Sequence, residues 1–110
     1  MKYLGPLSSE TSGGRTFWVD FQNQLNSNEY LSSINSIISS DTDLIISNET
    51  ILTSGLTTED SHLLPSGQAM SFYGSCIVEK TNLACITINY TTTANNSDST
   101  KVQLKIVPEI

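Results

Sequence analysis

Short runs of alternating apolar and polar residues are the feature that most constrains how this chain can fold. Successive side chains of a β-strand point to opposite faces, so such a run buries one face and exposes the other. The runs are separated by clusters of Gly, Asn, Asp, Ser and Pro, which are typical of turns. We therefore expect strands in TFWVDF, DLIIS, TILTS, AMSFYGSCIV, LACITINYTTT and KVQLKIV.

The alternation also predicts which side chains form the core. The expected inward residues are Phe17, Val19 and Phe21, then Ala84, Ile86, Ile88 and Tyr90, and finally Val102, Leu104 and Ile106. Lys101, Gln103 and Lys105 should then face water. A turn over Asn95–Ser99 is expected before the last strand, because Asn, Asp and Ser favour turns.

The segment EYLSSINSIISSDTDLIIS, residues 29–47, is harder to interpret. Tyr30, Ile34 and Ile38 share one parity, but Ile37 breaks the alternation. A helix over residues 29–39 would also gather these four side chains on one side. We favour strands, because β-branched residues and Ser dominate the segment and both are poor helix formers.

Length and strand spacing together indicate the fold class. A chain of 110 residues forms one domain, and six or seven short strands in that length are typical of an all-β, immunoglobulin-like antiparallel β-sandwich. We assign the sandwich to residues 16–110. Residues 1–15 lack alternation and are expected to be a flexible, irregular arm, and Gly55–Gln68 is expected to be one long loop.

Charge and composition limit the classes of partner that we expect. The chain carries 11 acidic and 5 basic side chains, a formal charge of −6, which opposes binding to nucleic acid or to anionic membranes. Its start, MKYLGPLSSETSGG, lacks the continuous apolar stretch of a signal peptide. No window approaches the roughly 20 apolar residues of a membrane span. We expect a protein made in a cytoplasm.

The residues offer little for catalysis or metal binding. His62 is the single histidine and could join Asp60 and one of many Ser in a triad, but such triads are defined by geometry and a loop histidine is common. Asp41, Asp43 and Asp98 lie in turn-forming runs that do not complete a calcium loop. We expect no enzyme activity, no metal and no cofactor.

Cys76 and Cys85 are the only cysteines. If EKTN, residues 79–82, is a hairpin loop, Cys76 lies opposite Cys85 and a cross-strand disulfide is geometrically possible. Without secretion, two reduced thiols adjacent across the hairpin are the favoured state.

The order of these features resembles the small virion proteins of bacteriophages known as fiber-tail adaptors. The corresponding residues are Trp18, Asp20, Phe21, Leu25, Ile34–Ser36 and Thr87–Thr93. The resemblance covers roughly residues 16–107. Ile37 stands where an aromatic residue is common in that family, and Gly55–Gln68 is longer than in the family.

The resemblance implies a non-enzymatic virion component that joins fibers to the tail or to the head-tail connector. Its partners would be other virion proteins and copies of itself in a symmetric assembly. A capsid decoration protein is one alternative, and a carbohydrate-binding or adhesive surface module, in which Trp18 and tyrosines stack on sugars, is another. The expected partner-binding residues lie in the arm and the loop: Tyr3, Leu4, Leu7, Leu56, Leu63, Leu64 and Pro65.

Overall fold

The computed structural model describes residues 2–9, 14–57 and 63–108, and this part of the chain is all-β apart from one 3-10 turn, η1 (Gln22–Gln24). Nine strands are present in these described ranges. They are β1 (Lys2–Ser9), β2 (Arg15–Asp20), β3 (Leu31–Ser39), β4 (Leu44–Ile51), β5 (Leu56–Thr57), β6 (Leu63–Leu64), β7 (Ala69–Cys76), β8 (Asn82–Thr92) and β9 (Ser97–Pro108). No helix in the described residues is long and apolar enough to cross a membrane.

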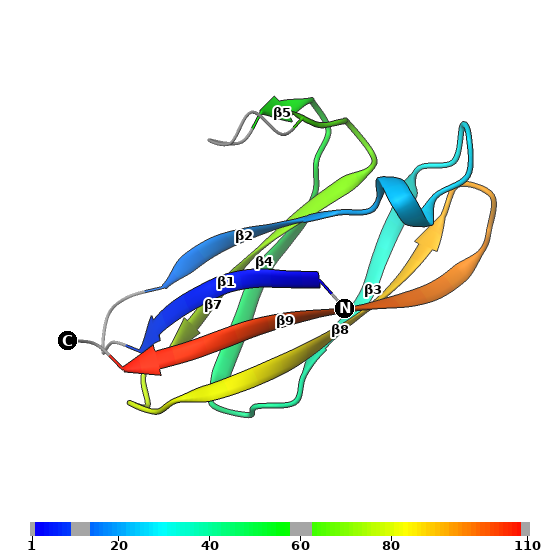
Figure 1. Cartoon of the computed structure of the whole chain (residues 1–110). Coiled ribbons are helices and arrows are strands. Elements are labelled where there is room, and N and C mark those ends of the chain that lie inside the picture. Colours follow the sequence, from blue (N-terminus) through cyan, green and yellow to red (C-terminus); the bar gives the residue numbers. More distant parts are fainter. Residues whose placement is uncertain (1, 10–13, 58–62, 109–110) are drawn as a thin grey trace.

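The strands form two main sheets (Figure 1). One has four strands in the order β1-β9-β8-β3, and the other has three in the order β2-β7-β4. β5 and β6 pair separately as a small ribbon. All pairings are antiparallel except that of β1 with β9, which is parallel. The all-β prediction is confirmed.

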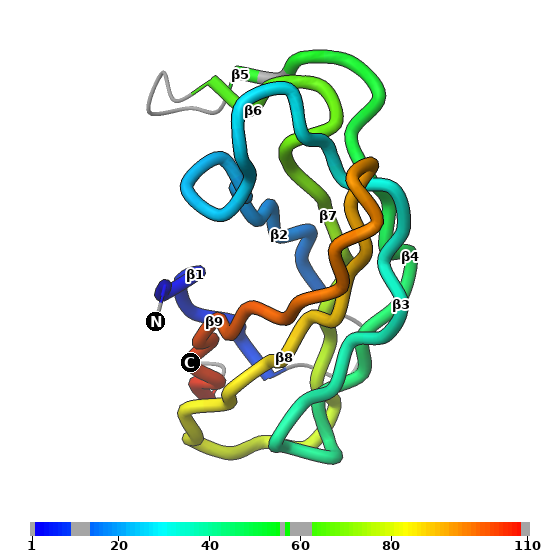
Figure 2. Tube along the Cα trace, turned by 90° about the vertical axis from the view of Figure 1, so that its right-hand side faces the viewer, coloured from blue at the N-terminus to red at the C-terminus, as the bar shows by residue number. Residues whose placement is uncertain are grey.

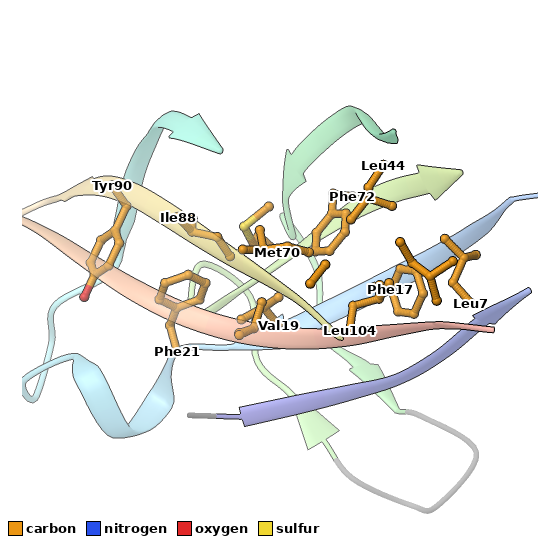
Figure 3. Packing of buried hydrophobic residues seen from close by; sticks show 14 of the residues in the cluster. Leu7, Phe17, Val19, Phe21, Leu44, Met70, Phe72, Ile88, Tyr90 and Leu104 are labelled. Carbon is orange, nitrogen blue, oxygen red and sulfur yellow. The ribbon is translucent and has the colours of Figure 1, made fainter. Parts of the chain in front are cut away.

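The core lies between the facing sides of the two sheets (Figure 3). Phe17 stacks on Phe72 with ring centroids 5.6 Å apart, and Phe21 meets Tyr90 edge to face at 4.9 Å. All ten predicted core residues of the regular strands are buried, which confirms the alternation: Phe17, Val19, Phe21, Ala84, Ile86, Ile88, Tyr90, Val102, Leu104 and Ile106.

The expected irregular arm is wrong for Lys2–Ser9, which form β1 beside β9. Leu7 is 2% exposed and belongs to the core. The register shifts between Tyr3 and Pro6, and Gly5 between them has φ +114°. This irregularity removes the alternation by which a strand is recognised in a sequence. In addition, the strand that pairs with β1 comes from the far end of the sequence, so a local pattern does not reveal it. Deleting the segment would therefore remove a sheet strand rather than a loose tail.

β3 contains most of the isoleucine-rich segment, and its pairing with β8 determines which of the isoleucines face the core. Its register with β8 shifts between Leu31 and Ser33 and again between Ile34 and Ser36, so Ser32 and Asn35 are extra residues. The inward side chains are therefore spaced by three rather than two: Leu31, Ile34 and Ile37 lie opposite Thr92, Tyr90 and Ile88. Each bulge lets one polar residue leave the ladder without turning the next apolar residue outward. Tyr30 and Ile38, which share the parity of Ile34 in the sequence, are exposed.

Candidate docking site

The connection between β7 and β8 carries the most exposed apolar side chain of the described residues. The exposed fractions are 64% for Ile77, 43% for Val78 and 52% for Leu83. Ile77 continues the parity of Ser71, Tyr73 and Ser75, which face away from the core on β7, so the strand pattern itself turns it outward. Figure 2 shows this connection at the same end of the molecule as the β3–β4 connection.

A charged cluster ties the two connections together. Lys80 Nζ lies 3.2 Å from each carboxylate oxygen of Asp41 and 2.6 Å from Asp43 Oδ2. Asn82 Nδ2 donates to Asp41 Oδ2 at 2.7 Å, and the backbone N–H of Asp43 donates to Asp41 Oδ1 at 2.9 Å. Asp41 is buried. A buried carboxylate is stable only with such partners, so this loop pair is held in one arrangement.

The electrostatics of the cluster favour its charged form. The side-chain hydrogen bond from Asn82, with the Asp43 N–H and Lys80, holds the pKa of Asp41 below its ordinary 3.8. The hydrogen bonds from Lys80 to Asp43 and Asp41 raise the pKa of the ammonium group above its ordinary 10.5. Both groups are therefore charged across the neutral range, and the ion pair persists there.

The exposed apolar side chains consequently project from a braced backbone. Besides the Lys80 anchor, the Cys76 thiol donates to the carbonyl oxygen of Val78 at 3.3 Å, and Leu83 already lies in β8, opposite Lys105 of β9. A surface that is ordered before binding loses less conformational entropy on association. We call Ile77, Val78 and Leu83 the apolar knob.

A second polar cluster closes the opposite end of the molecule. The buried Glu29 accepts the backbone N–H of Asn26 at 2.9 Å through Oε1. Its Oε2 accepts the Thr92 hydroxyl at 2.6 Å and Asn96 Nδ2 at 2.9 Å. These bonds join the segment before β3 to the β8–β9 turn. A hollow of about 300 Å³ lies beside them, lined partly by Gln24. Every Glu29 contact is to a backbone or neutral donor, so its role is structural.

We expect acid to weaken the fold by protonating the carboxylates of Asp41 and Glu29. The Asn26 N–H, then Thr92 and Asn96, lower the pKa of Glu29 from its ordinary 4.5. A carboxyl with a depressed folded-state pKa stabilises the fold fully above its unfolded pKa, and this contribution is lost as the pH falls through the folded value. Thermal melting should therefore change little from pH 7 to 5 and fall below pH 4.5.

Glu29→Gln is the matched control for this pH dependence, because it keeps the size and removes the titration. The variant should melt below the wild type at pH 7, and the gap should narrow by pH 3. A gap that stays constant over this range would contradict the assigned role of the Glu29 carboxylate.

The three residues of the arm that were expected to bind partners differ in their exposure. Tyr3 is exposed, Leu4 is half-buried against the core, and Leu7 is inside it. Leu7 therefore presents no surface to a partner. Of the three, Tyr3 alone has the exposure that a docking residue needs.

The residues of the Gly55–Gln68 loop that were expected to bind partners also differ in their exposure. Leu63 is exposed, Leu64 is buried and Pro65 is half-buried. Leu56 lies in β5, and its side chain is outside the described part of the structure. The loop is not wholly irregular, since β5 pairs with β6 in register Leu56 to Leu64. Backbone bonds also tie its end to the main sheets, for example from the N–H of Leu31 in β3 to the carbonyl of Gly67 at 2.7 Å.

The expected hairpin between the two cysteines is wrong. Cys76 pairs with Leu44 in the three-stranded sheet, whereas Cys85 pairs with Gln103 in the four-stranded sheet. The segment between them crosses from one sheet to the other, which a hairpin does not do. The two thiols form no disulfide, and they are not cross-strand neighbours. EKTN resembles a hairpin loop in sequence, but the packing of the sheets decides its path.

The triad expectation concerns residues outside the described ranges, since His62 and Asp60 both lie between β5 and β6. Within residues 2–9, 14–57 and 63–108, no three His, Cys, Asp or Glu side chains gather as metal ligands. Asp41 and Asp43 are instead bridged by Lys80.

Sequence reasoning missed the apolar knob, although the unbroken Ile77-Val78 pair at the end of an alternating run was a signal for it.

The comparisons with known proteins give no family for this chain. A scan against models of protein families found no match, and a search of curated proteins found none either.

Proposed function

We propose that this chain is a non-enzymatic structural module, an immunoglobulin-like sandwich, that docks on other proteins through the apolar knob. The setting that we propose is a bacteriophage virion, where the module would join fibers to the tail or the head-tail connector. The resemblance to fiber-tail adaptors supports the setting. The braced, exposed side chains of Ile77, Val78 and Leu83 support the docking role.

The strand order supports the immunoglobulin-like assignment. Immunoglobulin sandwiches place strands B, E and D in one sheet and C, F and G in the other. In this chain β2, β7 and β4 take the places of B, E and D, and β3, β8 and β9 take those of C, F and G. β1 lies parallel to the last strand, so it occupies a first-strand position beside G.

Large apolar groups that are exposed to water favour docking, because burial removes their surface from water. Burying one such side chain fully contributes roughly 1.5–3 kcal/mol. Ile77 and Val78 together could therefore supply a large part of the free energy of a moderate contact, since about 1.4 kcal/mol corresponds to tenfold in affinity. Several copies in a symmetric assembly would multiply a weak single contact into stable attachment.

The double substitution Ile77→Ser/Val78→Ser tests the docking role. We expect occupancy of the tagged chain in purified virus particles, measured by quantitative mass spectrometry, to fall by about tenfold or more. Ile38→Ser is the matched control, because Ile38 is equally apolar and exposed but lies in β3, outside the β7–β8 connection. Its occupancy should equal that of the wild type.

Two further results would decide between the alternatives. Normal occupancy of the double variant together with loss for Leu63→Ser would move the contact to the β5–β6 ribbon. Separated heads and tails distinguish the virion roles, since an adaptor stays with tails and a decoration protein stays with heads. Absence of the wild-type chain from every particle fraction would contradict the virion setting.

A further inference from the structure

The first and last strands of the described residues, β1 and β9, lie side by side and run in the same direction. Figure 1 shows their arrowheads at the same end of the molecule. The chain therefore enters this pair at the start of β1 and leaves it at the opposite end, after β9. Tension between the two ends of the chain pulls β1 backward and β9 forward, so the two strands are loaded to slide past each other.

The direction of loading decides how many contacts break at once. Strands that slide lose all the contacts of their ladder in one step, because the evenly spaced bonds of a parallel pair share the load. Strands that are pulled apart from one end lose the same contacts one after another. Forced unfolding is governed by the barrier along the loaded path. Sliding therefore resists tension more strongly than peeling does.

The register of β1 with β9 opposes sliding. After the irregularity between Tyr3 and Pro6, Pro6–Ser9 lie opposite Lys105–Pro108 in consecutive register. Within this stretch Leu7 faces Ile106, and both side chains are buried in the core. A slip by one residue turns every side chain of a strand to the other face. Sliding of β1 therefore requires Leu7 to leave the core.

Side-chain hydrogen bonds and the neighbouring strands also hold the pair in place. The Ser9 hydroxyl donates to the carbonyl oxygen of Val107 at 3.1 Å, at the end of β1. Arg15 Nη1 donates to the carbonyl oxygen of Pro6 at 3.1 Å, which joins β1 to β2. β9 is itself paired with β8 over ten consecutive positions without a shift of register. Both strands of the pair are thus anchored to other parts of the fold.

We propose that the β1–β9 pair is a mechanical clamp, through which this module carries tension between the chain segments that precede β1 and follow β9. The load passes directly from one strand to its neighbour. The rest of the fold, including the apolar knob, therefore stays intact under any tension that the clamp withstands. The inference depends on the strand pairing, and it holds whether or not the knob docks on another protein.

Single-molecule force spectroscopy of the full chain tests the clamp by changing only the direction of loading. In the first geometry the chain is pulled through its two termini. In the second it is pulled through its N-terminus and an azide-bearing amino acid that replaces Lys101, an exposed residue next to Val102, the partner of Lys2. The second geometry peels the same pair from one end. The first peak force should be severalfold higher, and equal forces in the two geometries would overturn the proposal.

Leu7→Ala and Leu31→Ala separate the clamp from general stability. Leu31 is 6% exposed and lies in β3, the opposite edge strand of the same sheet, whereas Leu7 is 2% exposed and lies in β1. Both variants should melt at a lower temperature than the wild type, but only Leu7→Ala should lower the peak force between the termini. Circular dichroism checks that each variant is folded. An equal loss of force in the two folded variants would contradict the clamp, and if either variant fails to fold, the two pulling geometries decide.

Discussion

Deletion of Thr87 is expected to prevent the chain from folding. β8 pairs with β9 along ten consecutive positions with no shift of register, and its alternate residues fill the core: Ala84, Ile86, Ile88, Tyr90 and Thr92. Removing one residue from a regular strand turns everything on one side of the deletion to the other face. Losing the burial of even two of these side chains costs roughly 3–6 kcal/mol, which is a large share of a small domain's stability.

Deletion of Asn35 is the matched control, and the opposite result is expected. Asn35 is an extra residue of β3, so without it Ile34, Ser36 and Ile37 still face Tyr90, Asn89 and Ile88 in a regular ladder. The loss is the hydrogen bond from Asn35 Nδ2 to the Thr91 hydroxyl at 2.8 Å and the one that the Ser33 hydroxyl donates to Asn35 Oδ1 at 2.9 Å, which costs about 1 kcal/mol. Urea unfolding followed by circular dichroism should show a cooperative transition for this deletion and none for that of Thr87. Equal stabilities would contradict the assigned bulge.

Phe21→Ala should lower the free energy of unfolding by about 3–5 kcal/mol. Phe21 is fully buried directly after β2, packs edge to face on Tyr90, and lies close to Val19 and Met70 in the core (Figure 3). Its backbone N–H also donates to the carbonyl of Gln68 at 2.9 Å, which fixes its position. Truncation leaves a cavity that a close-packed interior fills poorly.

Trp18→Ala is the control for this second prediction. Trp18 is a larger aromatic residue within β2, three positions before Phe21, but its side chain points away from the core. The change should cost less than Phe21→Ala does, because 41% of Trp18 is exposed already and its loss opens no cavity in the core. Equilibrium urea denaturation measures both variants. A larger loss for Trp18→Ala than for Phe21→Ala would mean that the two faces of β2 are reversed.

The local sequence predicted the elements whose ladders are regular. β2, β8 and β9 alternate without interruption, and their inward residues were identified correctly because a period of two is a direct consequence of strand geometry. The predicted turn before β9 was slightly misplaced, since the chain turns at Thr93–Asn96 and β9 begins at Ser97. Such boundaries depend on single hydrogen bonds that propensity does not specify.

The sequence did not reveal the elements whose partners are distant or whose ladders contain extra residues. β3 buries Leu31, Ile34 and Ile37 because two bulges change the phase relative to β8, and a bulge is defined by the opposing strand. β1 is a strand because β9, about a hundred residues later, supplies its hydrogen-bonding partner. Neither condition can be detected within a local window.

The same distinction holds for the candidate sites. Alternation by itself determined that Trp18 faces outward, because Trp18 lies between the inward residues Phe17 and Val19 of its strand. Only the tertiary structure decided that Cys76 and Cys85 belong to different sheets and that Lys80 meets Asp41 across 39 positions of the sequence. Those contacts depend on where the chain crosses between sheets, and that crossing is fixed by the packing of both faces against one core.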